Sequence, residues 1–360
     1  MKRLLNIQRI DFVLLGSTVA LSAMGILVIR SATAGGRFAG YPGRQAYWLA
    51  IAIVAYFIGY FLDRRHLQRG AYAFYWVIFA VLLGLAAAGN WIGGVQRWIH
   101  AGGLTFQPSE LAKLALILVL ARHFSQRRSS PPYGLEEIIV PILLVAGFAI
   151  PVALQPDLGT AMFLILVAGI VILFVGVRWS TLIVLLAGAA AAAPSLFFAL
   201  KDYQRDRILN FLSPGRDPLG TGYHVVQSKI AIGSGGLFGK GFLQGTQSQL
   251  RFIPEQHTDF IVSVLAEEFG FTGVLLMLGL ILFISLYALS YLESTRTRFS
   301  LIVVMGITTS FALQAAINIA MAAGVLPVVG LPLPLMSYGG SSLVCTFLGF
   351  GIIAGYKRRR

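Results

Sequence analysis

Three carboxylates stand in short polar segments of an otherwise apolar chain. Glu110 and Asp157 each follow a Gln-Pro pair, and Asp259 lies in the segment 254–260, Pro-Glu-Gln-His-Thr-Asp-Phe. A carboxylate within hydrogen-bonding reach of a hydroxyl can remove its proton as a general base. Carboxylate oxygens are also ligands that suit Mg²⁺ and Mn²⁺. These residues could act in either role. In a metal site, Asp259 would be a ligand together with Glu110 or Asp157.

A purely structural explanation competes for each of these acids. Proline suits the first position of a helix, so Glu110 and Asp157 fall in a first helical turn, where the helix dipole favours a negative charge. Glu110 and Lys113 are three residues apart and would share a helix face as an ion pair. Asp259 stands at the start of a predicted helix, where it could equally be a helix-start acid. The sequence leaves both explanations open.

Glycines and basic residues are concentrated further along the chain. The segment 220–245 contains eight glycines. Backbone N–H groups of glycine can approach an anion closely, and Lys229, Lys240 and Arg251 would supply positive charge. The spacing is not that of a Walker A loop, because Gly241 stands where Ser or Thr should bind magnesium. Anion binding and a merely flexible loop are the two interpretations.

The chain as a whole has the composition of a membrane protein. Of its 360 residues, 57% are hydrophobic and 12% are charged, and the mean hydropathy is +0.79. Soluble domains carry about 25% charged residues. A soluble enzyme and a disordered tail are therefore excluded. So is a disulfide scaffold, because the single cysteine, Cys345, allows no intramolecular disulfide.

Ten apolar stretches approach the roughly 20 residues that a membrane-spanning helix needs. We predict an all-α polytopic membrane protein, with one integral membrane domain over residues 1–360 and a long extracytoplasmic loop, 201–258, between helices seven and eight. The first stretch is longer than the core of a signal peptide, so we expect an uncleaved span. The predicted spans lie near residues 12–29, 46–62, 71–88, 108–123, 138–154, 159–176, 180–200, 259–291, 301–322 and 340–356.

The basic residues predict how the chain is oriented. Ten spans place both termini on one side, whose loops hold 16 of the 28 Lys and Arg residues, against five in the short loops of the other side. Since Lys and Arg mark cytoplasmic loops, both termini are predicted to be cytoplasmic. The net charge of +14 then reflects topology, and no nucleic-acid partner is expected. The polar segments all fall on the outer face, which indicates a site there.

A Pro- and Gly-rich stretch, 324–340, belongs to the same predicted face. Irregular backbone is not tolerated facing lipid, because its N–H and C=O groups need partners. We therefore expect this stretch to line a cavity or to form a short re-entrant turn.

These motifs, in this order, resemble those of the shape, elongation, division and sporulation (SEDS) family of bacterial wall polymerases. The match covers most of the chain, although the first hundred residues agree only by hydropathy. The sequences of segments 233–241 and 245–249, the latter Gly-Thr-Gln-Ser-Gln, are most similar to those of the elongation members of the family. The segments that carry the resemblance are 106–110, 155–160, 222–224, 227–233, 245–249, 254–260 and 333–341.

The resemblance implies a ten-helix glycosyltransferase of the bacterial cytoplasmic membrane that polymerises lipid II into glycan strands at the outer surface. It also implies a class B penicillin-binding protein as partner, whose transpeptidase crosslinks the product, besides contacts with lipid II and membrane lipid. In the family the Asp of the His-Thr-Asp-Phe motif is essential, which carries over to Asp259. The acid and the lysine of the Gln-Pro-Ser-Glu segment carry over to Glu110 and Lys113, and the Gln-Pro-Asp acid to Asp157.

The chemistry so implied assigns roles to the candidates. Asp259, with Glu110 and Lys113, would be catalytic, and Asp259 would remove the proton of the attacking hydroxyl. Positive side chains would stabilise the departing diphosphate. A divalent cation fits a diphosphate leaving group, although no residue requires one, and no organic cofactor is expected. The candidate substrate-binding residues are Asp157, Gln155, Lys229, Lys240, Arg251, Glu255, His257 and Ser337.

Two other functions compete with this one. A flippase that moves lipid II across the membrane would also carry charged residues near helix ends, but it should show polar groups through its spans and on both faces. A scaffold that only recruits the transpeptidase would leave the outer carboxylates without a purpose.

Overall fold

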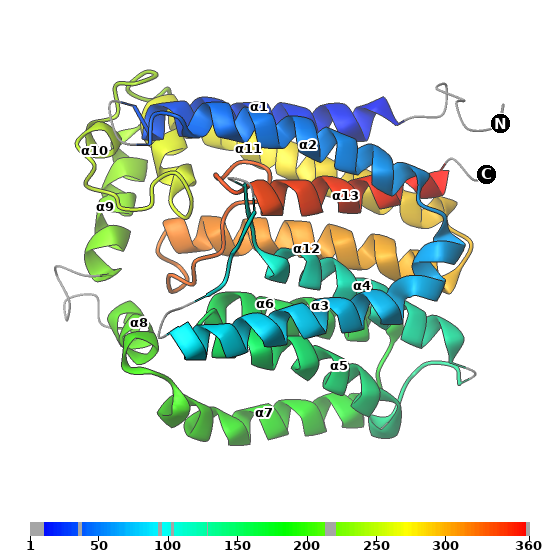
Figure 1. The fold of residues 1–360 in the computed structure, drawn as a ribbon. Helices are drawn as coiled ribbons and strands as arrows, with labels where there is room; N and C mark the ends of the chain where they lie inside the picture. Colours follow the sequence, from blue (N-terminus) through cyan, green and yellow to red (C-terminus); the bar gives the residue numbers. More distant parts are fainter. Residues whose placement is uncertain are drawn as a thin grey trace.

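The computed structural model describes residues 11–34, 38–92, 96–101, 104–127, 129–212 and 221–357. Long helices run side by side, and the start of α1 and the end of α13 lie at the same end of the bundle, while α8, α9 and α10 lie at the other end (Figure 1). The helices are α1 (Phe12–Ala32), α2 (Tyr41–Phe61), α3 (Arg64–Ile92), α4 (Pro108–Gln126), α5 (Leu135–Leu154), α6 (Leu158–Val175), α7 (Trp179–Ala199), α8 (Asp202–Leu212), α9 (Thr221–Ser234), α10 (Thr246–Gln249), α11 (Ile261–Ser294), α12 (Arg298–Ala322) and α13 (Gly340–Lys357).

Each of the ten predicted spans coincides with one of these helices, namely α1 to α7 and α11 to α13. Among the described residues, six helices are both long and apolar enough to cross a membrane: α1, α3, α5, α6, α11 and α12. Shorter apolar stretches occupy most of α7 and α13. The chain is thus a largely helical, multi-pass membrane protein. The segment 201–258, predicted as a loop, contains the helices α8, α9 and α10.

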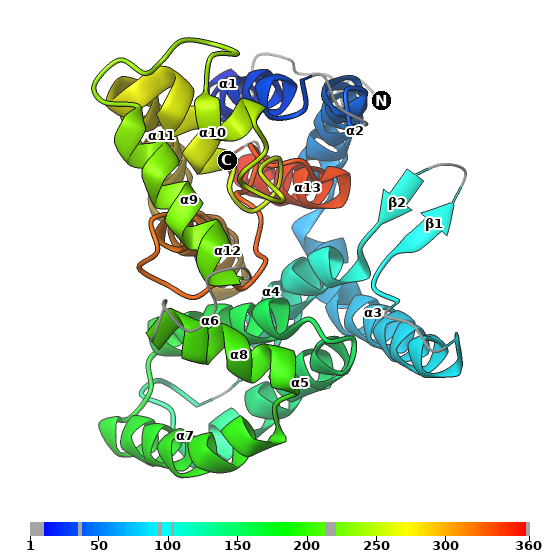
Figure 2. The ribbon, with the colours of Figure 1, turned by 90° about the vertical axis from the view of Figure 1, so that its left-hand side faces the viewer.

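Apolar side chains cover the outside of the bundle as well as its core. Ile183 and Leu186 on α7 are 63% and 61% exposed, and Leu275 and Leu276 on α11 are similarly exposed. Figure 2 shows α7 at the edge of the molecule. Such a surface is unfavourable in water, where burying apolar area contributes roughly 25 cal/mol per Å². It is the surface expected where the neighbouring solvent is lipid.

A short antiparallel hairpin follows α3, and its second strand lies near α13. Its strands are β1 (Ile99–Ala101) and β2 (Leu104–Phe106), with Ile99 opposite Phe106. Gln107 follows β2 directly, and α4 begins at Pro108. The hairpin therefore leads the chain into the first turn of α4, where Glu110 lies.

Helix α11 is broken near its start, and the glycine-rich segment 235–241 bridges the break. Gly270 interrupts the helix with φ of 65° and ψ of −161°. The carbonyl oxygens of Glu267 and Glu268 accept hydrogen bonds of 3.0 Å from the N–H groups of Lys240 and Gly241. Beyond the break, the N–H groups of residues 271 and 272 donate to the carbonyls of residues 236 and 237. The segment thus supplies the partners that the broken helix lacks, as buried backbone groups require.

This bridging explains the glycines better than anion binding does. A side chain at Gly235 would overlap the carbonyl oxygen of Ala266, and one at Gly239 would overlap that of Glu268. Gly239 and Gly241 also have φ of 80° and 105°, a region that residues with a side chain rarely adopt. The first part of α11, which begins two residues after Asp259, is thereby held in place.

Candidate functional site

A cavity of about 640 Å³ opens between the N-terminal ends of α4 and α6, the start of α8, the turn before α11 and the stretch between α12 and α13. The Pro- and Gly-rich stretch 324–340 contributes several of its residues, so its expected place along a cavity is confirmed. Helix ends and irregular backbone meet here, which lets polar groups face one space. The lining residues are Arg97, Trp98, Gln107, Glu110, Pro156, Asp157, Leu158, Gly159, Met162, Gln204, Arg207, Glu255, Thr258, Asp259, Pro327, Val328, Val329, Gly330, Pro332, Tyr338, Gly339, Ser341 and Ser342.

The structure brings together four of the acids that the sequence singled out. Glu110, Asp157, Glu255 and Asp259 all line this cavity, although up to 149 positions of sequence separate them. Their basic neighbours in the lining are Arg97 and Arg207. The cavity is therefore rich in carboxylates, with two guanidinium groups beside them.

Asp259 is the acid whose surroundings do not explain it as a helix-start residue. The residue before α11 is Phe260, and no side chain caps that end of the helix. Within the described part of the chain, the Asp259 carboxylate accepts no hydrogen bond, whereas its backbone does. Of the four acids that line the cavity, it is thus the one whose carboxylate accepts no hydrogen bond and forms no ion pair within the described residues.

The carboxyl group of Asp259 also has a raised pKa. Its pKa is raised from 3.8 to about 6, chiefly by burial and also by the nearby charges of Glu255 and Asp157, while the charge of Arg207 acts to lower it. A desolvated carboxyl with acidic neighbours disfavours its charged form. A pKa near 6 suits a general base, which works best when its pKa lies close to the operating pH.

The turn before α11 aims Asp259 into the cavity. Glu255 has a left-handed backbone conformation, with φ of 48°. Its carbonyl oxygen accepts hydrogen bonds of 3.1 Å from the N–H groups of both Thr258 and Asp259. A residue with a side chain adopts this conformation only at some cost in energy, and such residues often occur at functional sites.

Two carboxamides of α12, which are not among the residues predicted from the sequence, hold the backbone around the site. Asn318, which is fully buried, donates to the carbonyl oxygens of Asp259 (3.0 Å) and Leu331 (2.8 Å). Gln314, one turn earlier, donates to the carbonyl of Pro332 at 2.8 Å. The available signal was the spacing: two carboxamides four residues apart in an apolar helix share one face.

Glu110 and Lys113 form the ion pair that their spacing suggested. Their charged atoms lie 2.8 Å apart, and both side chains are largely buried. Lys113 also donates to the side-chain oxygen of Gln314 at 2.8 Å and lies 5.4 Å from the centre of the Phe163 ring. The pair therefore connects α4 to the carboxamides of α12, and Glu110 faces the cavity while Lys113 does not.

Asp157 serves as a helix cap and still faces the cavity. One carboxylate oxygen accepts from the N–H of Thr160 at 3.2 Å, at the start of α6, and the other from the side chain of Gln107 at 3.3 Å. Gln155 does not line the cavity; its side chain donates to the carbonyl of Leu82, and its own carbonyl accepts from Arg97 at 2.7 Å.

His257 and Ser337 lie just outside the cavity lining. His257 packs among the rings of Phe38, Tyr41 and Tyr338, with ring centres 5.2 to 5.9 Å apart, and burial lowers its pKa. The hydroxyl of Ser337 donates to the carbonyl of Thr258 at 2.5 Å and accepts from an N–H of its own loop. Both residues support the turn that carries Asp259.

The three basic residues of the glycine-rich region are not brought to the cavity. Lys240 pairs with the buried carboxylate of Glu267 at 2.8 Å. Arg251 reaches the carbonyl of Ala34 at 3.5 Å. Lys229 lines a smaller neighbouring pocket. Arg207 lines the cavity instead. Its sequence position carries no distinguishing signal, because it is one of several arginines in the segment 201–258.

The residues present suit a metal ion only in part. Within the described residues, no three His, Cys, Asp or Glu side chains lie close enough together to hold one. Glu110 is engaged by Lys113 and Asp157 by α6, which leaves Asp259. Magnesium is commonly bound through one or two carboxylates together with phosphate oxygens of the substrate. The site fits a cation shared with a substrate, and does not form a closed cage.

Residues 3–360 match the family model described as cell cycle protein, FtsW/RodA/SpoVE. The chain belongs to this family. It is 41% identical over 344 residues to the peptidoglycan glycosyltransferase MrdB of Escherichia coli K12, covering 95% of this chain and 92% of that protein. It is 34% identical over 356 residues to a probable peptidoglycan glycosyltransferase FtsW of Trichlorobacter lovleyi, covering 95% and 92%. The predicted SEDS membership is thereby confirmed.

Solved structures agree with the family assignment. One, of a peptidoglycan synthase complex that coordinates polymerization and crosslinking, contains a chain with 35% identity and a TM-score of 0.81, covering 98% of both chains. The crystal structure of the rod shape determining protein RodA of Thermus thermophilus has 30% identity and a TM-score of 0.71, covering 98% of this chain and 97% of that one. The helical arrangement described above is therefore shared with these two structures.

Proposed function

We propose that this protein is a peptidoglycan glycosyltransferase that polymerises lipid II at the outer face of the bacterial cytoplasmic membrane during cell elongation. The observation that carries the proposal is the Asp259 carboxylate, which faces a large polar cavity with a pKa raised to about 6. The names of the relatives, peptidoglycan glycosyltransferase MrdB among them, support the substrate class.

The proposed reaction joins two lipid-linked sugars. The 4-hydroxyl oxygen of one molecule attacks C1 of the other, in line with the bond to the diphosphate, and the configuration at C1 inverts. The new C–O bond forms as the bond between C1 and the diphosphate oxygen breaks. The electron pair of that bond leaves with undecaprenyl diphosphate, and the hydroxyl proton passes to Asp259. A positioned base of this kind contributes about 10²–10⁴-fold to a rate.

Arg207 is best placed to stabilise the departing diphosphate. It lines the cavity and is close enough to Asp259 to lower the pKa of that carboxyl. A guanidinium group binds phosphate oxygens through two parallel hydrogen bonds. Lys113, in contrast, is already paired with Glu110. A divalent cation, Mg²⁺ or Mn²⁺, would be held by Asp259 and the diphosphate oxygens and would add further positive charge there.

The proposal includes a partner and an orientation. A class B penicillin-binding protein would crosslink the product, and the solved synthase complex supports such an assembly.

Ten spans with both termini in the cytoplasm would put the cavity on the outer face. A cysteine in place of Asp202, whose side chain is 99% exposed, should then react with an impermeant maleimide in intact cells. One at Arg65 should react only after permeabilisation. Background labelling is low because the native Cys345 is buried.

Polymerisation from purified lipid II, with and without the partner, tests the function. Wild type should produce glycan strands, and Asp259→Ala should produce none while remaining folded and bound to the partner. Asp202→Asn, which removes an exposed acid outside the cavity, should polymerise like wild type. If wild type makes no polymer even with partner and divalent metal, transport of lipid II becomes the better explanation. If Asp259→Ala polymerises normally, Asp259 is not the base.

A further inference from the structure

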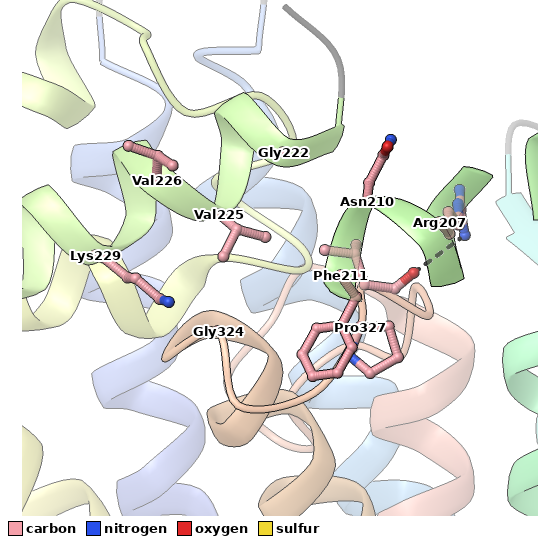
Figure 3. Close-up of a pocket in the computed structure, with 10 residues that line it drawn as sticks. Arg207, Asn210, Phe211, Gly222, Val225, Val226, Lys229, Gly324 and Pro327 are labelled. Carbon is pink, nitrogen blue, oxygen red and sulfur yellow. Dashed lines mark hydrogen bonds between the residues drawn. The ribbon is translucent and has the colours of Figure 1, made fainter. Parts of the chain in front are cut away.

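A second, smaller pocket shares a wall with the cavity. It measures about 60 Å³ and lies between α8, α9 and the turn that follows α12 (Figure 3). Arg207, Pro327 and Val328 line both spaces. Arg207 also donates a hydrogen bond of 3.4 Å to the carbonyl of Val328, which holds the shared wall together. The two spaces are therefore neighbours, with Arg207 between them.

The charges of the small pocket are opposite to those of the cavity. Its two charged side chains, among the ten described residues that line it, are Arg207 and Lys229, and neither Asp nor Glu is present. The cavity has four carboxylates against two guanidinium groups. The small pocket therefore attracts an anion, because opposite charges a few ångströms apart near a protein surface attract each other.

The size of the pocket limits the anion to a small group. On this measure a single water needs roughly 10–15 Å³, so about 60 Å³ has room for roughly four to six waters, which suits a phosphate or diphosphate group but not a sugar. The rest of the wall is largely apolar, with Phe211, Val225 and Val226 beside the cations. A phosphate joined to a hydrocarbon chain matches both parts of the lining.

Lys229 is positioned by the backbone across from it. Gly324 has φ of 69°, and a side chain there would overlap Cε of Lys229 and come within 2.7 Å of Nζ. Figure 3 shows the ammonium group directed toward Gly324 and the turn. Within the described residues Lys229 forms no hydrogen bond or ion pair, so its charge is available to a ligand.

We propose that this pocket binds the diphosphate of the second lipid-linked substrate, the one that supplies the attacking hydroxyl. The inference rests on the proposed function, in which two polyprenyl diphosphate-linked sugars meet. The leaving diphosphate is bonded to the carbon under attack and must lie in the cavity, on the side of that carbon opposite the attacking hydroxyl. The other diphosphate lies at the far end of its own sugar unit, and the small pocket is not lined by Asp259. Arg207 faces both diphosphates, whereas Lys229 contacts only the diphosphate in the small pocket.

Counting bound diphosphates tests the pocket without any turnover. Undecaprenyl diphosphate is titrated into the full-length chain in nanodiscs, and the molecules bound per chain are counted by native mass spectrometry. Wild type should bind two and Lys229→Glu only one. Lys201→Glu, the same charge change at an exposed residue outside the pocket, should still bind two. A wild type that binds one, or a Lys229→Glu variant that binds two, overturns the proposal.

Two further measurements identify the ligand and its role. Inorganic diphosphate alone should bind the pocket at least about tenfold more weakly, because it lacks the apolar contact; equal affinity would overturn the assignment to a lipid-linked group. In polymerisation assays, Lys229→Glu should raise the apparent KM for lipid II by about tenfold or more, and Lys229→Arg should restore it. A chain that binds two diphosphates yet makes no polymer contradicts the proposed function and not this pocket. A chain that polymerises but binds one contradicts the pocket.

Discussion

The side chain of Asn318 donates a hydrogen bond of 3.0 Å to the backbone carbonyl of Asp259 and one of 2.8 Å to that of Leu331. These two carbonyls belong to the turn before α11 and to the stretch between α12 and α13. One buried carboxamide therefore sets the distance between the proposed base and the opposite wall of the cavity. Asn318 touches no reacting atom, so it is a positioning residue.

Replacing Asn318 by Ala should lower polymerisation by about 10²-fold, because a small misplacement of a catalytic group has an effect of this order. The loss should appear in kcat more than in KM, and the acid limb of the pH–rate profile should move, since the environment of Asp259 changes. Thr309→Ala, in the same helix and outside this network, is the matched control. A purely structural role for Asn318 would lower the melting temperature and leave the pH profile of the remaining activity unchanged.

The pH dependence of polymerisation should report the ionisation of Asp259. A base must be ionised, and burial raises the pKa of this carboxyl to about 6, so the rate should fall as the pH drops through about 6. Glu255→Gln removes a negative charge that raises this pKa and should move the acid limb to lower pH. Arg207→Gln removes a positive charge that lowers it and should move the limb to higher pH. Unchanged limbs in both variants would rule out Asp259 as the titrating group.

Asp259→Asn should make the protein more stable at neutral pH while abolishing activity. A carboxyl whose pKa is raised from 3.8 to about 6 in the folded state stabilises the fold below pH 4, and that contribution is lost as the pH rises through 6. At pH 7 the difference is at most about 3 kcal/mol. The melting temperature of the variant should therefore exceed that of wild type at pH 7.5, and the gain should vanish below pH 4.

Removing the helix-capping acid Asp157 should instead make the protein less stable at neutral pH. Asp157→Ala removes the side chain that accepts from the N–H of Thr160, which typically costs about 0.5–2 kcal/mol. Its melting temperature should fall at neutral pH. A variant as stable as wild type would show that the cap contributes nothing.

The bridge across the break in α11 should be sensitive to a single methyl group. Gly239→Ala should lower both the melting temperature and the polymerisation rate, because the added Cβ would overlap the carbonyl of Glu268 and displace the segment that holds the start of α11. Gly233→Ala is the matched control, since it lies in α9 with open space around it and alanine favours helix by up to about 1 kcal/mol. Equal behaviour of the two variants would show that the bridge is unimportant for the site.

Removal of divalent cations should separate the two proposed roles of Asp259. If Asp259 shares a cation with the diphosphate, chelation by EDTA should abolish polymerisation, and Mg²⁺ or Mn²⁺ should restore it. The pH limb near 6 should then shift with the metal concentration, because metal and proton compete for one carboxylate. Full activity in EDTA would leave proton removal as its role.

The sequence by itself determined the helices and the candidate residues of the site. Apolar stretches of about 20 residues permit little besides membrane helices, which is why the ten predicted spans coincide with helices. Glu110 and Lys113 are neighbours on one helix turn, so local spacing sufficed to predict their ion pair. The family motifs directed attention to Asp259.

Only the tertiary structure decided what those residues do together. Sequence alone could not tell that Asp157 caps a helix while the Asp259 carboxylate is free, because both precede a helix. Lys240 pairs with Glu267, 27 residues away, so Arg207 and not Lys240 supplies positive charge to the cavity. Such partners depend on where the chain returns in space, which neither composition nor periodicity records. The sequence therefore set the elements and their lipid-facing surfaces, and the packing of distant segments set charge, burial and pKa at the site.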